Sequence, residues 1–320
     1  ASYVLADLLA EGTVPAGDTF WSAITEAEYQ AVLDAADRAE AAAEALIDVS
    51  GYKPRASEPI HAGFKIQKDG IWYSPDWLIQ VGAGQSNRLG NANATNGSKT
   101  GTSTGNVFAW NGTSIVQATL GSLPFNTAAG QVNNIDFHEA HRISSETGRP
   151  VLIILHAIPG TSIGTWLPPY AGNGFTPGVN WTGLVNKIAA ALSSGSAVLW
   201  GKTTVDLFGW SQGEDEYNLA PLFTLSTDRY PALINGVLGA SWASPLLQFI
   251  ATQCLPQSAG GTAFAVNGEW DKVVASGAVD RVFVVTGEGL VTTGADVGQI
   301  VHYDGASLQQ LGYRSADIYL

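Results

Sequence analysis

The sequence contains one cysteine, Cys254, and no methionine in its 320 residues. A single cysteine excludes an intrachain disulfide and a cysteine-based metal site. Its neighbours resemble a helix end rather than an electropositive nucleophile site, so we expect an inert, packed thiol. A lone thiol fits a reducing compartment without excluding an extracellular one. Because no initiator methionine is present, we expect the chain to be processed or to be part of a longer protein.

Basic residues are also scarce, since 15 Lys and Arg face 28 Asp and Glu and give a formal net charge of −13. Binding to phosphates requires clustered Lys and Arg, so the sequence predicts no nucleic-acid partner and no anionic membrane surface. No apolar run approaches the roughly 20 residues that span a bilayer. The N-terminus also lacks the basic-then-apolar pattern of a secretory signal. A neutral substrate fits this charge balance better than an anionic one.

Two regions of different composition follow one another along the chain. Residues 1–70 are predicted to form a helical segment and a linker, and residues 71–320 a second, larger domain. Residues 25–49 are rich in Ala and Glu and carry a narrow stripe of small residues at helical spacing. This stripe fits either a lone helix packed on the domain or a helix that associates with copies of itself into a homo-oligomer. Residues 51–59 read as the linker.

The second region alternates short apolar runs with helical patterns. Apolar strands that alternate with helices indicate a parallel sheet covered on both faces, an α/β/α three-layer sandwich. The predicted strands are residues 77–81, 151–155, 205–210 and 282–285, and the clearest helices are residues 181–192 and 229–238. Functional groups on such sheets gather at the carboxyl ends of the strands.

The first predicted strand ends in the sequence Gly-Ala-Gly-Gln-Ser-Asn, which places Ser86 just beyond it. A serine flanked by small residues at a strand end is exposed as a nucleophile must be, and glycines let a substrate approach the backbone. The G-x-S-x-G elbow of α/β-hydrolases fails here, because its fifth position is Arg88. The motif by itself also fits an ordinary Gly-rich turn.

Two further strand ends carry groups that suit an oxyanion hole. Gly160 follows the second strand, and its backbone N–H is a possible donor to a developing oxyanion. Gln212 follows the third strand and offers a side-chain N–H. Each segment also fits a plain turn. The acidic residues after Gln212, among them Glu214, are more typical of a solvated face or of a helix N-terminus.

A histidine suited to general-base catalysis follows late in the chain, since His302 precedes a predicted helix over residues 306–319. Among the other histidines, His138 and His141 lie three apart on one predicted helix, on the side expected to be exposed. They are a conceivable metal pair, but no third ligand is indicated, so we predict no metal site.

Together these segments resemble the SGNH/GDSL hydrolase superfamily, and specifically its carbohydrate acetylesterase branch of the sialate O-acetylesterase and acetylxylan esterase family 6 type. The likeness covers roughly residues 71–320 and rests on four segments in order. They are Gly84-Gln85-Ser86-Asn87, residues 159–166, residues 210–216, and residues 299–302 before the final helix. The resemblance implies a flavodoxin-like α/β/α fold and a need for neither metal nor organic cofactor.

The resemblance also implies a role for each matching residue. Ser86 is the expected nucleophile and contributes its own N–H to an oxyanion hole that Gly160 and Gln212 complete. His302 is the expected base and Glu214 a residue that braces the site.

Three departures from the family pattern bear on this expectation. Pro159 replaces the first glycine of a pair, and Glu216 replaces the last aspartate of the third segment. Gln299 stands where the family places the aspartate of its triad. A glutamine oxygen can accept the imidazole N–H but does not stabilise an imidazolium by charge. Asp296 or Glu214 is a possible replacement acid, and a Ser–His dyad is the alternative.

The leading hypothesis is therefore an esterase that removes O-acetyl groups from a polysaccharide, with an acetylated glycan as its partner. The alternative that Gln299 suggests is a carbohydrate-binding module that keeps the fold and has lost turnover. The Ala-rich helix and linker before such a domain also resemble phage tail-fibre or tailspike proteins that act on host surface glycans, which would make the protein virion-associated or extracellular.

Overall fold

The computed structural model describes residues 66–68, 71–73, 77–90, 101–102, 106–125, 133–195, 199, 202–216, 224–255, 262–277, 281–291 and 302–320. The chain divides into two units, residues 1–59 and 60–320, and every described residue belongs to the second. The predicted N-terminal helix and linker, Asp296 and Gln299 lie outside the described residues. The predicted domain boundary and the self-association of that helix therefore stay predictions.

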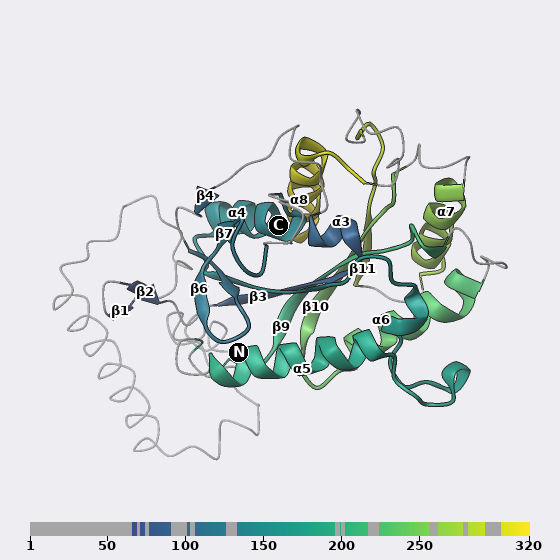
Figure 1. The fold of residues 1–320 in the computed structure, drawn as a ribbon, viewed down its shortest axis with the longest axis horizontal. Helices are drawn as coiled ribbons and strands as arrows, with labels where there is room; N and C mark the ends of the chain where they lie inside the picture. Colours follow the sequence, from purple (N-terminus) through teal and green to yellow (C-terminus); the bar gives the residue numbers. More distant parts are fainter. Residues whose placement is uncertain are drawn as a thin grey trace, which may run out of the picture. The chain divides into compact units, whose positions relative to one another are not determined.

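A seven-stranded sheet forms the centre of the second unit (Figure 1). Its strands are β3 (Leu78–Gly84), β5 (Val107–Trp110), β6 (Ile115–Gln117), β8 (Val151–Ala157), β9 (Val205–Ser211), β10 (Ala243–Thr252) and β11 (Val282–Val285). Their order is β11-β10-β9-β3-β8-β5-β6, and all neighbours are parallel except β5 and β6. Without β5 and β6, the order is 2-1-3-4-5, the flavodoxin-like arrangement. The predicted α/β fold is confirmed.

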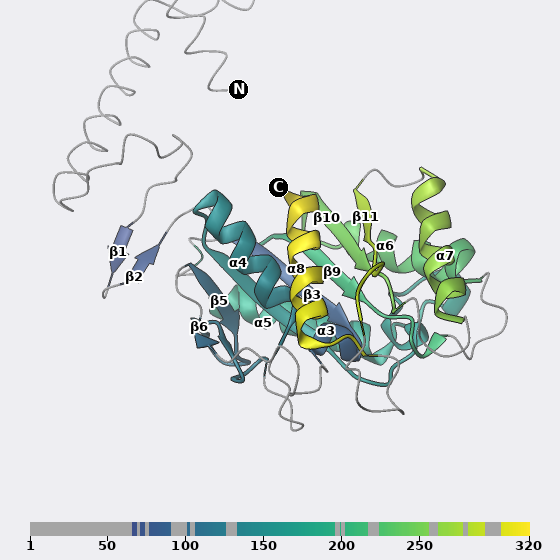
Figure 2. The same cartoon turned by 90° about the horizontal axis from the view of Figure 1, so that it is seen from above.

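Helices cover both faces of this sheet. They are α3 (Ser86–Leu89), α4 (Ile135–Thr147), α5 (Val179–Ser194), α6 (Tyr230–Leu238), α7 (Thr262–Ala275) and α8 (Gly305–Tyr319). Figures 1 and 2 show α4 and α8 side by side on one face, with α5 and α6 on the other. Among the described helices, none combines the length and the apolar character that a membrane crossing requires.

Short elements complete the described part of the chain. They are the 3₁₀ turns η2 (Ile163–Trp166) and η3 (Ala171–Asn173), the π-helical turn η5 (Leu225–Arg229), and the strand pairs β1 (Ile66–Lys68) with β2 (Ile71–Tyr73) and β4 (Gly101–Thr102) with β7 (Thr119–Leu120). Both pairs are antiparallel.

Local sequence explains where α4 begins and ends and where α8 begins. The side chain of Asn134 caps α4 by accepting a hydrogen bond from the N–H of Phe137, and Gly148 ends that helix with a φ of 70°. Asp304 caps α8 by accepting from the N–H of Ser307 at 2.7 Å. The cap at Asp304 fixes the start of α8 just beyond His302.

The two faces of the sheet bury separate cores, as the alternation along β3 shows. Ile79, Val81 and Ala83 belong to the core under α5 and α6, whereas Leu78 belongs to the core under α4 and α8. Cys254 is buried in the first core just after β10, so the expected helix end at this cysteine was wrong and the expected packing was right. The carboxyl ends of β3, β8 and β9 meet at one edge, where the candidate site lies.

Candidate active site

The turn that carries Ser86 is fixed between two neighbouring strands. Gly84 ends β3 with a φ of 125°, and a Cβ at this position would lie 2.1 Å from the carbonyl oxygen of Ser211, so only glycine fits. The N–H of Gln85 donates to that same carbonyl at 2.9 Å, and the N–H of Ile158 donates to the oxygen of Gly84 at 2.8 Å. The start of α3 is therefore held by β9 on one side and by the end of β8 on the other.

Ser86 and His302 meet at this edge although 216 positions separate them in the chain. The Nε2 atom of His302 lies 2.8 Å from the Oγ atom of Ser86, a hydrogen-bond distance. Burial lowers the pKa of His302 below its usual 6.5, because the charged imidazolium loses its water. A neutral imidazole beside a serine hydroxyl is the arrangement needed to take up the hydroxyl proton.

Asn87, the residue after Ser86, joins the two segments that carry this pair. Its Oδ1 atom accepts a hydrogen bond from the backbone N–H of Tyr303 at 3.1 Å, and its Nδ2 atom donates to the carboxylate of Glu214. The hydroxyl of Tyr303 donates to the carbonyl of Gln253 at 2.9 Å. The motif alone predicts no separate role for Asn87, because a contact to a backbone N–H leaves no signal in residue types.

Glu214 lies in the buried interior, 7% exposed, and Glu216 is fully buried, so the solvated face expected for this acidic segment was wrong. Burial raises the pKa of Glu214, while its hydrogen bond from Asn87 opposes that rise. Glu214 thus reaches the His302 segment through Asn87, as a bracing residue would.

Gln212 follows β9, and its side-chain nitrogen is already engaged. The Nε2 atom donates to the carboxylate of Glu216 and, at 3.3 Å, to the carbonyl of Thr161. The same carboxylate accepts from the backbone N–H of Ile163. Glu216 therefore ties the second and third motif segments together, and both amide hydrogens of Gln212 point to protein acceptors rather than to a free site. Its donation to an oxyanion stays a prediction.

Gly160 lies in an exposed turn after β8, with a φ of 66° that favours glycine. Within the described part of the chain, neither its backbone N–H nor that of Ser86 has a hydrogen-bond acceptor. Two of the three predicted oxyanion donors are therefore available to a ligand, and their roles also stay predictions.

A buried charged cluster lies behind the Ser86 turn. Arg88, on the same short helix, forms ion pairs with Asp136 and Glu139 of α4, and all three side chains are fully buried. Gln80 of β3 donates to both carboxylates. The glycine Gly209 makes room for the arginine, since a Cβ there would lie 1.6 Å from Nη2 of Arg88. The cluster anchors α3 on the sheet beneath the candidate nucleophile.

The remaining described histidines do not form a metal site. His138 is 5% exposed, with Nε2 at hydrogen-bond distance from Oδ1 of Asn133, so the expected exposed position was wrong for this residue. His156 is largely enclosed, and burial together with the nearby charge of Lys187 lowers its pKa to about 4. Among the described residues, no three His, Cys, Asp or Glu side chains are grouped as metal ligands.

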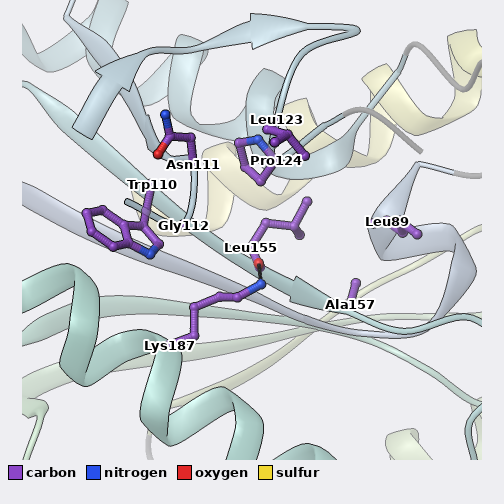
Figure 3. A pocket seen from close by; sticks show the side chains of 9 residues that line it. All are labelled: Leu89, Trp110, Asn111, Gly112, Leu123, Pro124, Leu155, Ala157 and Lys187. Carbon is purple, nitrogen blue, oxygen red and sulfur yellow. Dashed lines mark hydrogen bonds between the residues drawn. The ribbon is translucent and has the colours of Figure 1, made fainter. Parts of the chain in front are cut away.

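A pocket lies beside the Ser86 turn at the end of β8 (Figure 3). Its lining residues come from α3, α5, β8, the end of β5 with the turn that follows it, and the turn after β7. They are Leu89, Trp110, Asn111, Gly112, Leu123, Pro124, Leu155, Ala157 and Lys187. Lys187 reaches from α5, and its Nζ atom donates to the carbonyl of Leu155 at 3.0 Å.

Comparison with known proteins supports the fold. No protein-family model matches the chain, and no curated protein matches it. A solved structure of a protein from Arabidopsis thaliana is similar, with a TM-score of 0.58 and 15% identity over 76% of this chain and 97% of that one. NanS is similar with a TM-score of 0.52 and 12% identity over 78% and 98%. A carbohydrate acetylesterase from Xanthomonas citri gives a TM-score of 0.48 and 14% identity over 79% and 58%. At these identities the likeness concerns the fold.

Proposed function

We propose that this protein is a serine esterase that removes O-acetyl groups from a carbohydrate. The observation that carries the proposal is the hydrogen-bond distance of 2.8 Å between Ser86 and His302 at the carboxyl edge of the sheet. The four motif segments resemble those of the carbohydrate acetylesterase branch, and this resemblance suggests an acetylated carbohydrate as the substrate. In the exposed turn of Gly160, the backbone N–H has no acceptor in the described part of the chain and is available to a ligand.

The first half of the proposed reaction acylates the enzyme. The Oγ atom of Ser86 attacks the acetyl carbonyl carbon while Nε2 of His302 takes the hydroxyl proton. The N–H groups of Ser86 and Gly160 stabilise the oxyanion of the tetrahedral intermediate. When the intermediate collapses, the bond to the sugar oxygen breaks and the departing oxygen receives the proton from His302. The products are a free sugar hydroxyl and an acetyl-serine.

The second half releases acetate. Water attacks the acetyl-serine, and His302 removes a proton from the water as it attacks. The resulting intermediate expels the Ser86 oxygen, which recovers its proton from His302. The net change is hydrolysis of one ester bond by one water molecule, with Ser86 as the nucleophile and His302 as the group that moves the protons.

Acetate release tests the proposal directly. The wild-type protein is expected to release acetate from acetylated sugars and from p-nitrophenyl acetate with multiple turnover. The Ser86→Ala variant is expected to lose on the order of 10⁴ or more in kcat, as is typical when a nucleophile is removed. Ser145→Ala, an exposed serine on α4, is the matched control. A Ser86→Ala variant that retained wild-type turnover would contradict the proposal.

A carbohydrate-binding module without turnover is the second candidate, because Gln299 stands where the family has an acid. It predicts that acetylated sugars bind to the wild-type protein, measured by calorimetry, while no acetate appears. Multiple turnover that depends on Ser86 would exclude it.

A further inference from the structure

The pocket in Figure 3 adjoins the candidate nucleophile through two elements. Leu89 lies one helical turn after Ser86 on α3, and Ala157 pairs in the sheet with Gly84, two residues before Ser86. The pocket lining thus begins within one helical turn of Ser86 on α3 and at the strand residue that pairs with Gly84.

The pocket exists because one strand stops short. β5 pairs with β8 only as far as Ala109 and Ile153, whereas β8 continues to Ala157 beside β3. In the part of the chain that the structure describes, the last residues of β8 thus lack a strand neighbour on the β5 side. Lys187 fills part of this gap by donating to the carbonyl of Leu155 at 3.0 Å, and Figure 3 shows this bond among the residues that line the pocket.

Lys187 is the charged side chain among the nine lining residues, and the side-chain oxygen of Asn111 already accepts hydrogen bonds from Thr113 and Ser114. Lys187 has three ammonium hydrogens and uses one on the carbonyl of Leu155. Trp110, which is 4% exposed, lines the same pocket, and Figure 3 shows its indole among the lining side chains. No Asp or Glu is among the nine lining residues, although the protein carries a formal net charge of −13.

Lys187 differs from the two other lysines whose side chains are described. Lys202 pairs with Asp206, and Lys272 pairs with Glu269. In the described part of the chain, Lys187 has no carboxylate partner, and burial lowers its pKa because the ammonium loses water. A half-buried cation without a counter-ion is stabilised by any anion that enters the pocket.

We propose that this pocket binds the carboxylate of an acidic sugar, a uronic acid unit of the acetylated glycan, with Lys187 as the anion-binding residue. Trp110 lines the same pocket. This inference rests on the proposed esterase activity and specifies further that its substrate is negatively charged. The overall charge balance favoured a neutral substrate, whereas this proposal has an anionic one. A charge in the pocket acts on a bound anion more strongly than distant surface charges do, because solvent and salt screen the distant ones.

A matched pair of substrates tests the inference. Acetylated methyl glucuronoside and acetylated methyl glucoside differ only in a carboxylate against a hydroxymethyl group. The wild-type protein is expected to prefer the glucuronoside by about tenfold in kcat/KM, as is typical for a charge-assisted contact, chiefly through a lower KM. Added salt should reduce this preference. Equal kcat/KM values for the two substrates would overturn the inference.

Variants of Lys187 separate anion binding from a purely structural role. Lys187→Met is expected to reduce the preference ratio to near one, and Lys187→Arg to retain most of it, because arginine keeps the charge. Lys272→Met removes a lysine on α7 and is expected to keep the wild-type ratio. The ratio is measured within each variant, so a loss of overall activity does not obscure it. A Lys187→Met variant that kept the preference would reject the role of Lys187.

A binding measurement keeps the two proposals distinguishable. If neither substrate releases acetate, the esterase proposal fails, and the pocket is then tested by titrating the wild-type protein with unacetylated methyl glucuronoside and methyl glucoside. Binding of the glucuronoside alone, weakened about tenfold or more by Lys187→Met and kept by Lys187→Arg, supports the pocket. Equal binding of both sugars, or of neither, rejects it.

Discussion

The Oδ1 atom of Asn87 accepts a hydrogen bond from the backbone N–H of Tyr303 at 3.1 Å. These residues are the immediate successors of Ser86 and His302, so one side chain joins the turn of the candidate nucleophile to the segment of the candidate base. Asn87 is fully buried and is itself held by the carboxylate of Glu214. The distance between Ser86 and His302 is therefore set by their neighbours as well as by their own contact.

Removal of Asn87 is expected to impair catalysis more than binding. In Asn87→Ala the His302 segment loses its link to the Ser86 turn, and we expect kcat to fall roughly 10- to 100-fold with little change in KM, since a small misplacement of a reacting group has a cost of this size. Steady-state kinetics on p-nitrophenyl acetate measures both constants. The control is Asn106→Ala, whose side chain makes one long, exposed hydrogen bond to Gly148.

The neighbouring carboxylate sharpens this test. Asn87→Asp keeps an oxygen that can accept from Tyr303 but places a second carboxylate against buried Glu214. We therefore expect Asn87→Asp to lose activity as well, with a partial recovery as the pH falls, because the raised pKa of Glu214 lets it accept a proton readily. Wild-type kcat in Asn87→Ala would show that Asn87 does not position the pair.

The pH profile should report the environment of His302. A base works in its unprotonated form, so kcat/KM falls as the pH drops through its pKa. Burial lowers the pKa of His302 below 6.5, and the acidic limb of kcat/KM is expected to lie below that pH. A profile on p-nitrophenyl acetate measures the limb directly. A limb at pH 7 or above would indicate that a charge partner raises the pKa of His302.

Substitution of Gln299 tests the third member of the predicted triad. If Gln299 occupies the position of the family aspartate, Gln299→Asp supplies a charge that stabilises the imidazolium, and kcat is expected to rise by about tenfold or more. Asp296→Asn is the companion variant, and it is expected to lower kcat only if Asp296 serves as the acid. Unchanged kcat in both variants would favour a Ser–His dyad.

The buried cluster behind the site should make stability depend on pH. Burial and the neighbouring Asp136 raise the pKa of Glu139 to about 8, although Arg88 opposes the rise. The folded protein then holds a proton between about pH 4.5 and 8 that the unfolded chain releases, so this residue's contribution to stability is full below that window and is lost as the pH rises through it.

Glu139→Gln removes this titration and keeps an oxygen for Gln80 and Arg88. We expect the free energy of unfolding of the wild type, relative to Glu139→Gln, to decrease from pH 5 to pH 8 by at most about 1.4 kcal/mol per pH unit. Chemical denaturation at several pH values measures it. Glu146→Gln, an exposed position on the same helix, is the control. A parallel pH dependence for the wild type and Glu139→Gln would contradict this prediction.

Much of the fold was predictable because parallel strands that are buried on both faces are continuous apolar runs. The runs at 77–81 and 151–155 proved to be β3 and β8, each two or three residues longer at its carboxyl end. β10 was missed, because Pro245 and the polar Ser244 and Gln248 interrupt its apolar pattern. β5 and β6 were missed because each has only three or four residues.

For the candidate site, the sequence by itself predicted which residues are candidates for the chemistry and near which strand ends they lie. Ser86, Gly160, Gln212 and His302 each follow or precede an element that apolar periodicity predicts, and order along the chain is enough to place them at one edge of a parallel sheet. Composition alone also gave the single cysteine, and with it the absence of an intrachain disulfide, and the acidic charge balance.

Only the tertiary structure decided how these groups interact. The contact of Asn87 with Tyr303 and the pairing of Arg88 with Glu139 join residues far apart in sequence, through distances that depend on how helices pack over the sheet. The pocket at Lys187 depends on where β5 stops pairing with β8. Such features follow from side-chain packing in three dimensions, whereas periodicity along the chain records only which face of an element is buried.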